Sequence, residues 1–188
     1  MKAISIVFLL FFASLFITEC SKEDTGVVET GIGTGTLTVA GVEYDMVEGI
    51  IYHNSGSVNY DIDLISSLTN NGIGSETCHL VALEMYAATS DGLPSDTYNC
   101  DMYKTSQAGT FTGLIAFDIN KETEDCSIFY DIKSGTIVVN HSDAQYEITV
   151  EVMTDKYEYD SGEDDFVISE SDIEIACYYT GSLKPSVH

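Results

Sequence analysis

Residues 145–152 read Gln-Tyr-Glu-Ile-Thr-Val-Glu-Val, a strict alternation of polar and apolar side chains. Successive side chains of a β-strand point to opposite faces of the sheet, so this alternation predicts a strand that buries one face and wets the other. Antiparallel sheets show such a pattern, whereas the strands of a parallel sheet covered by helices are apolar throughout.

The same period of two recurs on both sides of this stretch, at Val58–Leu64, Phe111–Ile119 and Ile173–Tyr179. Turn-forming pairs such as Ala40-Gly41 and Asp91-Gly92 separate the periodic segments, and no segment has sustained helical periodicity. Further strands are expected at Gly35–Val39, Val42–Val47, Ile50–His53, Cys78–Ala87, Thr97–Tyr103, Ser127–Ile132 and Gly135–Asn140.

About ten short strands in one domain predict an all-β fold, built as an antiparallel β-sandwich or, alternatively, as a β-barrel. A single open sheet is not expected, because it would leave one apolar face exposed to water. The chain has 188 residues and an apolar content of 44%, which is enough for one domain with a real core and too much for a mainly disordered chain.

The amino-terminal segment has the pattern of an export signal. Lys2 precedes an uncharged apolar run from Ala3 to Ile17, which is followed by Thr18-Glu19-Cys20. A charged start before a short apolar run predicts a signal peptide over residues 1–19. The run is shorter than the ~20 residues that a membrane-spanning helix needs.

The position of Cys20 resembles the processing site of bacterial lipoproteins, with Glu19 where that family prefers Gly, Ala or Ser. The resemblance implies that Cys20 is acylated and that the lipid attaches the protein to a membrane. The alternative is a plain secreted protein in which Cys20 is an ordinary thiol.

The sequence that follows Cys20 also resembles a known group. Cys20-Ser21-Lys22-Glu23-Asp24 is similar to the start of lipoproteins from Bacteroides-type bacteria, in which an acidic pair accompanies display on the outer surface. We therefore expect an outer-membrane, surface-exposed protein. Gly26, Gly31 and Gly33 predict that residues 20–34 are a flexible tether, which leaves 35–188 as the β-sandwich domain.

A second resemblance covers most of the chain after the tether, from Gly35-Thr36-Leu37-Thr38-Val39 to the final Tyr179-Thr180-Gly181-Ser182-Leu183. This order of segments looks like a group of uncharacterised gut-bacterial surface lipoproteins with β-sandwich folds. The resemblance implies a fold and a location, and it implies no activity.

The formal net charge is −24, and it is unchanged without residues 1–19 because Lys2 and Glu19 cancel. All seven basic residues are lysines. This charge disfavours nucleic acids and anionic phosphate ligands, which need concentrated positive charge. It favours cations and basic partners.

Apart from Cys20, the cysteines form an even set, and two disulfides with three alternative connectivities are open to them: Cys78, Cys100, Cys126 and Cys177. An exported chain meets the oxidising conditions that such bonds need. The alternative is four buried thiols, because Cys100 and Cys177 fall on the apolar faces of their strands. Spacing typical of a zinc site is absent.

The longest non-periodic stretch runs from Asp155 to Ser171 and is acidic. Its weak calcium candidates are Asp160, Glu163, Asp164 and Asp165, because calcium takes six to eight oxygen ligands on a loop that can curl. The spacing fits no EF-hand, and a solvated acidic hairpin loop is the alternative. We expect no other cofactor.

No catalytic residue is expected from motifs. Asp61 and Asp63 lie on one face of their strand, which paired carboxylates of a hydrolase would require, but a polar strand face has the same pattern. The histidines, His53, His79, His141 and His188, lack the HExxH spacing, and the chain has no Gly-x-Ser-x-Gly motif.

Twelve tyrosines and no tryptophan are the chain's aromatic signature. Tyr157, Tyr159 and Tyr178 bracket the acidic stretch and are the candidates for facing a ligand, since exposed aromatics hold sugars or proteins. Packing within the sheet is the alternative role for tyrosines in strands.

These observations favour a non-catalytic, lipid-anchored surface protein that is a binding or adhesion module for a glycan or for an envelope or host protein. One alternative is an extracellular hydrolase with carboxylates from distant strands, and another is a structural coat or fimbria-like component. The sequence leaves open the ligand, the disulfide pattern, the membrane leaflet and the oligomeric state.

Overall fold

The computed structural model describes 31–70, 76–103, 105–120, 123 and 125–186. These residues form an all-β structure, so the predicted fold class is confirmed, and the described part of the chain contains no helix. The predicted signal peptide, the predicted lipidation site Cys20 and residues 20–30 of the predicted tether lie outside the described residues.

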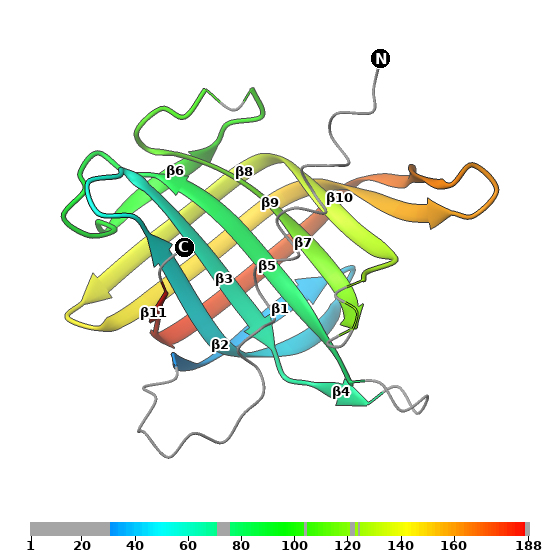
Figure 1. The fold of residues 1–188 in the computed structure, drawn as a ribbon, viewed down its shortest axis with the longest axis horizontal. Coiled ribbons are helices and arrows are strands. Elements are labelled where there is room, and N and C mark those ends of the chain that lie inside the picture. Colours follow the sequence, from blue (N-terminus) through cyan, green and yellow to red (C-terminus); the bar gives the residue numbers. More distant parts are fainter. Residues whose placement is uncertain (1–30, 71–75, 104, 121–122, 124, 187–188) are drawn as a thin grey trace.

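Eleven strands make one sheet (Figure 1). They are β1 (Ile32–Val39), β2 (Val42–His53), β3 (Asn59–Ser66), β4 (Thr69–Asn70), β5 (Glu76–Tyr86), β6 (Asp96–Cys100), β7 (Thr110–Asn120), β8 (Ile128–Ser142), β9 (Gln145–Asp160), β10 (Asp165–Ser182) and β11 (Lys184–Ser186). The strand order is β1-β10-β9-β8-β6-β7-β5-β3-β2-β11, and β4 pairs with β5. The path returns to its start, because β1 pairs with both β10 and β2.

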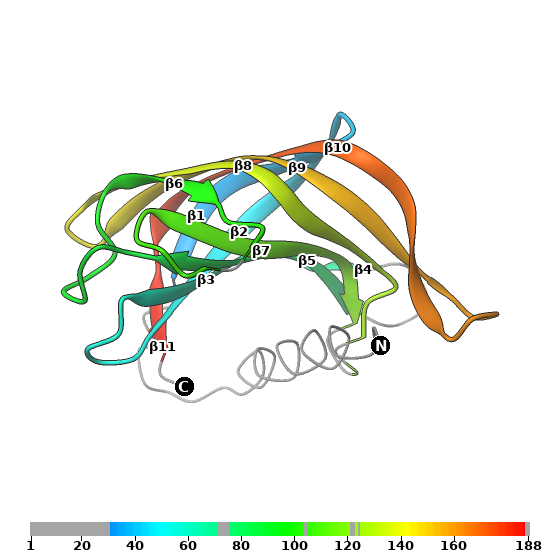
Figure 2. The same cartoon turned by 90° about the horizontal axis from the view of Figure 1, so that it is seen from above.

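Neighbouring strands are antiparallel except for β6–β7 and β11–β2. The sheet curves over so that β8, β9 and β10 lie on one side of the molecule and β3, β5 and β7 on the other (Figure 2). One hydrophobic core fills the space between them, with contributions such as Ile62, Leu83 and Phe111 from one side and Ile137, Val150 and Ile175 from the other. Burying each such side chain stabilises the fold by about 1.5–3 kcal/mol, which makes this core the main stabilising element.

Several strands are longer than the sequence pattern predicted. Segments 42–47 and 50–53 are one strand, β2, and segments 127–132 and 135–140 are one strand, β8. The register shifts at both junctions, between Met46 and Glu48 and between Ile132 and Ser134. A β-bulge inserts a residue and reverses the alternation without ending the strand, which explains the interrupted pattern.

The predicted non-periodic stretch is also strand. The hairpin of β9 and β10 continues to Asp160 and Asp165, so that only 161–164 form the turn. The register of β10 shifts twice, between Ile168 and Glu170 and between Glu170 and Ile173. β9 pairs with this part of β10 along one edge. Along the other edge β1 pairs with β10 only from Ile175 onward, and no described strand pairs with the preceding part of that edge.

The start of the domain packs around Tyr179, which is completely buried. A Cβ atom at Gly33 would lie 2.3 Å from the Tyr179 ring, and one at Gly49 would lie 2.5 Å from Leu183. The Tyr179 hydroxyl donates to the carbonyl of Ser182 at 2.7 Å. Gly33 therefore belongs to the packed domain, since β1 begins at Ile32, inside the segment expected to be tether.

Candidate functional site

Four aromatic side chains form a continuous row on the outer face of β8, β9 and β10: Phe129, Tyr157, Phe166 and Tyr159. The rings of Phe129 and Tyr157 are stacked, with centroids 4.8 Å apart and an interplanar angle of 2°. Phe166 meets Phe129 edge-on at 5.0 Å and Tyr159 at 5.6 Å. We call these four residues the aromatic row.

Strand register accounts for the row. Phe129 pairs with Tyr157 across β8 and β9, and Tyr159 pairs with Phe166 across β9 and β10. Tyr130, next in sequence to Phe129, belongs to the internal core, whereas Phe129 belongs to a separate hydrophobic cluster. The row therefore lies on the face opposite the core, as alternation requires.

The outer cluster extends from the aromatic row across β7 and β5. Ala116 and Ile119 are its other buried members, and Leu80 and Leu114 pack against them. The register places Leu80 beside Ala116 and Ala116 beside Phe129, so the apolar surface is continuous over three strand pairs. Ala116, Ile119 and Phe129 are only 5–8% exposed, so this part of the outer face is a second packed cluster. The accessible aromatic surface lies at Tyr157 and Phe166, which are half-buried, and at the exposed Tyr159.

Carboxylates lie at both ends of the aromatic row. Tyr159 is 47% exposed, and its hydroxyl donates to the carboxylate of Asp164 in the hairpin turn. Asp131 of β8 and Asp155 of β9 pair with each other, two positions along their strands from Phe129 and Tyr157, and therefore lie on the same face as these rings. Lys133 bridges Asp155 and Asp172 at 2.8 Å each, and these hydrogen bonds raise the pKa of Lys133 above its ordinary value. Hydrogen-bond acceptors therefore flank the row at its two ends.

Three of the four calcium candidates accept hydrogen bonds within the hairpin. Asp160 accepts from the backbone N–H of Gly162 at 2.8 Å, Asp165 accepts from that of Phe166 at 2.8 Å, and Asp164 accepts from Tyr159. Glu163 is exposed. Among the described residues, no group of three or more His, Cys, Asp or Glu side chains is arranged to hold a metal ion. Calcium binding here stays a prediction.

Of the three tyrosines predicted to face a ligand, Tyr157 and Tyr159 lie together in the aromatic row and Tyr178 does not. Tyr178 lies at the other end of β10, is 42% exposed and donates its hydroxyl to Glu147 at 3.2 Å. Sequence reasoning missed Phe129 and Phe166. The available signal was the i, i+2 spacing of Tyr157 and Tyr159, which puts both on one face and invites a search for aromatic partners on the neighbouring strands.

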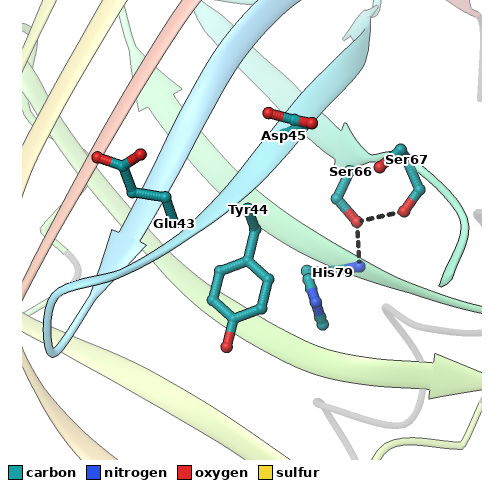
Figure 3. A pocket seen from close by; sticks show the side chains of 6 residues that line it. All are labelled: Glu43, Tyr44, Asp45, Ser66, Ser67 and His79. Carbon is teal, nitrogen blue, oxygen red and sulfur yellow. Dashed lines mark hydrogen bonds between the residues drawn. The ribbon is translucent and has the colours of Figure 1, made fainter. Parts of the chain in front are cut away.

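A pocket of about 200 Å³ opens at one end of the sheet (Figure 3). It is lined by Glu43, Tyr44, Asp45, Ser66, Ser67 and His79. The pocket exists because β3 ends at Ser66, while β2 and β5 continue past it on either side. The backbone N–H of Ser67 donates to the carbonyl of Asp45 at 3.0 Å and fixes the crossing segment.

His79 is the most buried polar side chain of the pocket, with 3% of its surface exposed. Its backbone N–H donates to Ser66 Oγ at 2.8 Å, and its Nδ1 accepts from the backbone N–H of Asp118 at 3.2 Å. Burial lowers the pKa of His79, and the nearby Asp118 carboxylate opposes this shift. The ring is therefore neutral near pH 7, with its proton on Nε2.

The carboxylates Asp61 and Asp63 lie on one face of β3, as predicted, and the register places Glu84 of β5 opposite Asp61. Glu84 accepts from Asn59 Nδ2 at 3.0 Å and from the Thr112 hydroxyl at 3.2 Å. Asp63 is 2% exposed, and burial, with a smaller contribution from Asp61, raises its pKa to about 8. None of these carboxylates lines the pocket at the end of β3.

All four cysteines of the described chain are free thiols in this structure. Cys177 lies in the core between Leu37 and Val150, and burial raises its pKa to about 12. Cys78 and Cys126 pack against the outer cluster. Disulfide formation among these cysteines stays a prediction.

Comparison with known proteins gives no family or relative for this chain: no family model, curated protein or solved structure matches it. In the part of the chain that the structure describes, no helix has the length and apolar character needed to cross a membrane.

Proposed function

We propose that this protein is a non-catalytic, lipid-anchored module of the outer surface that binds a glycan through the aromatic row. The observation that carries the proposal is the alignment of Phe129, Tyr157, Phe166 and Tyr159 on the outer face of three paired strands. The export signal and the lipoprotein-like Cys20 supply the location.

A row of rings on a sheet suits a glycan for two reasons. The face of a sugar ring that carries C–H bonds packs well on an aromatic face, and rigid rings lose little conformational freedom on binding. Carboxylates such as Asp131 and Asp164 beside the rings can accept hydrogen bonds from sugar hydroxyls. Strand pairing holds the rings and Asp131, and the hydrogen bond from Tyr159 holds Asp164 of the hairpin turn, so the surface is organised before a ligand arrives.

The hydrolase alternative is favoured by one observation, the buried Asp63 near Asp61 and Glu84. A carboxyl with a raised pKa can serve as a general acid. Catalysis also needs a concave site that holds the substrate, and the residues that line the pocket at the end of β3 include none of these three. We therefore rank binding above hydrolysis.

The test is a glycan array probed with the mature chain, followed by calorimetric titration of the best ligand. Tyr157→Ala and Phe166→Ala should each weaken binding at least about tenfold, as expected for aromatic residues at the centre of an interface. The control is Tyr178→Ala, which removes an exposed tyrosine of β10 that lies outside the aromatic row. Equal affinity of all three variants would contradict the proposal.

The location is tested separately by mass spectrometry of the mature protein from its native membrane. We expect the mass of a chain that begins at acylated Cys20, and Cys20→Ser should release the protein from the membrane fraction. A free Cys20 thiol in the native protein would contradict the anchor and leave the glycan test unaffected.

A further inference from the structure

The pocket at the end of β3 has a chemical character that differs from the aromatic row. Its inner wall is made of rings: Tyr44 and His79 meet edge-on with centroids 4.4 Å apart, and Phe117 lies behind both, at 5.3 Å from Tyr44 and 4.6 Å from His79. Figure 3 shows the Tyr44 and His79 rings next to one another, with Ser66 and Ser67 above His79.

The outer wall of the pocket is anionic. Glu43 and Asp45 flank Tyr44 on β2, and both are exposed to solvent. The side chains that line the pocket include no lysine. The imidazole of His79 adds no positive charge at neutral pH, because its Nδ1 accepts the Asp118 N–H and the ring is buried.

Aromatic rings beneath and carboxylates above are the two groups that recognise an ammonium ion. The negative faces of aromatic rings attract cations, and nearby carboxylates add a direct electrostatic attraction. An anionic ligand is repelled by Glu43 and Asp45. The hydroxyls of Ser66 and Ser67 offer additional polar contacts for the N–H groups of such a ligand.

The size of the pocket narrows the ligand further. Pockets that enclose a drug-sized molecule measure about 300–1,000 Å³, so a space of about 200 Å³ admits only a side-chain-sized group. A straight alkyl chain that ends in a primary amine has this size, and its methylene groups can pack on the Tyr44 ring.

We propose that this pocket binds a primary ammonium group on a short alkyl chain, supplied either by a lysine side chain of a polypeptide or by a free diamine. The proposal goes beyond glycan binding and uses none of the residues of the aromatic row. The net charge of −24 would draw either ligand toward the protein.

The experiment is a titration of the ¹⁵N-labelled mature chain followed by two-dimensional NMR at low salt. The probes are Nα-acetyl-lysine amide for the polypeptide source and 1,5-diaminopentane for the free diamine, with Nα,Nε-diacetyl-lysine amide as the uncharged control. We expect saturable shifts of the amide signals of Tyr44, Ser66 and His79 with one or both charged probes. The tighter of the two identifies the source.

Variants sharpen the test. Glu43→Gln and Asp45→Asn keep the shape of exposed side chains, so both should fold, and each should weaken binding by about fivefold, the upper range for an exposed ion pair. Glu151→Gln, an exposed carboxylate on β9, is the matched control and should leave the affinity unchanged. Equal shifts with the diacetylated probe, or unchanged affinity in both pocket variants, would overturn the proposal.

Discussion

Replacing Asp63 by Asn should stabilise the protein at neutral and alkaline pH. Asp63 lies on the outer face of β3 with 2% of its surface exposed, and its Oδ2 atom has no hydrogen-bond partner. Burial raises its pKa from 3.8 to about 8, and the neighbouring Asp61 carboxylate adds to the shift. The folded protein therefore holds a proton on Asp63 at pH values where the unfolded chain has released it.

The sign of the pH dependence follows from this difference in bound protons. Between pH 4 and 8 the folded state binds more protons than the unfolded state, so stability falls as the pH rises through this window and levels off above it. A shift of about four pH units corresponds to roughly 6 kcal/mol at most, at 1.4 kcal/mol per unit. Water penetration and local relaxation reduce such effects, so we expect about 2–4 kcal/mol, a large fraction of a typical domain's stability.

The measurement is urea unfolding of the wild type and Asp63→Asn, followed by circular dichroism at pH values from 5 to 9. The variant should match the wild type near pH 5 to within about 1–2 kcal/mol and exceed it increasingly toward pH 8, because an amide does not ionise. Asp91→Asn in an exposed turn is the control and should track the wild type. Parallel pH profiles of the wild type and Asp63→Asn would show that the Asp63 carboxyl is solvated and refute the reasoning.

Three further predictions concern the packing around Tyr179 and the titration of His79. Gly33→Ala should lower the free energy of unfolding by about 2–4 kcal/mol, because the added methyl group would lie 2.3 Å from the Tyr179 ring; denaturant titration measures it, and a loss below 1 kcal/mol would contradict this packing. Tyr179→Phe should lower the free energy of unfolding by about 1 kcal/mol, because the hydrogen bond to Ser182 is lost, and the m-value of the same denaturant titration should not change. An unchanged free energy of unfolding would contradict this role of the hydroxyl. Because burial lowers the pKa of His79, the free energy of unfolding should fall as the pH drops below 6.5. His79→Phe should reduce this loss of stability at acid pH, as measured by thermal melts at several pH values. An equally steep loss in the variant would show that another group causes it.

The fold class was predictable because it depends on side-chain alternation, which the sequence displays directly. Tyr146–Val152 alternates without interruption and lies in β9, paired along its length with β8 and β10. Strand boundaries were harder to predict. The bulge near Lys133 reverses the alternation inside β8, so one long strand looked like two.

The acidic stretch shows a second limit of sequence patterns. Residues 155–171 lack a clear period of two because they form a hairpin with two register shifts in β10. The first half of β10 is also largely exposed on both faces, so its sequence shows no alternation of apolar and polar residues. Its charge suggested a loop. Main-chain pairing with β9 forms a strand there instead.

The candidate sites depend on which strands become neighbours, and this information is not local in sequence. Tyr157 and Tyr159 could be placed on one face by their spacing, but Phe129 lies 28 positions before Tyr157 and meets it only through the register of β8 with β9. The pocket likewise joins Tyr44 to His79 because β3 stops between them. No residue spacing in the sequence predicts the Phe129–Tyr157 contact or the Tyr44–His79 contact.

The irregular outer edge of β10 has a consequence for the proposed display of the protein on a membrane. A straight strand with an unpaired edge can form backbone hydrogen bonds with the same strand of a neighbouring molecule, and anchoring in a membrane would concentrate such molecules in two dimensions. The two register shifts between Ile168 and Ile173 make this edge of β10 irregular. The negative charges of Glu170 and Asp172 would repel the same residues of a second copy. If the protein is anchored as proposed, we expect neighbouring copies to remain separate molecules instead of pairing through this edge.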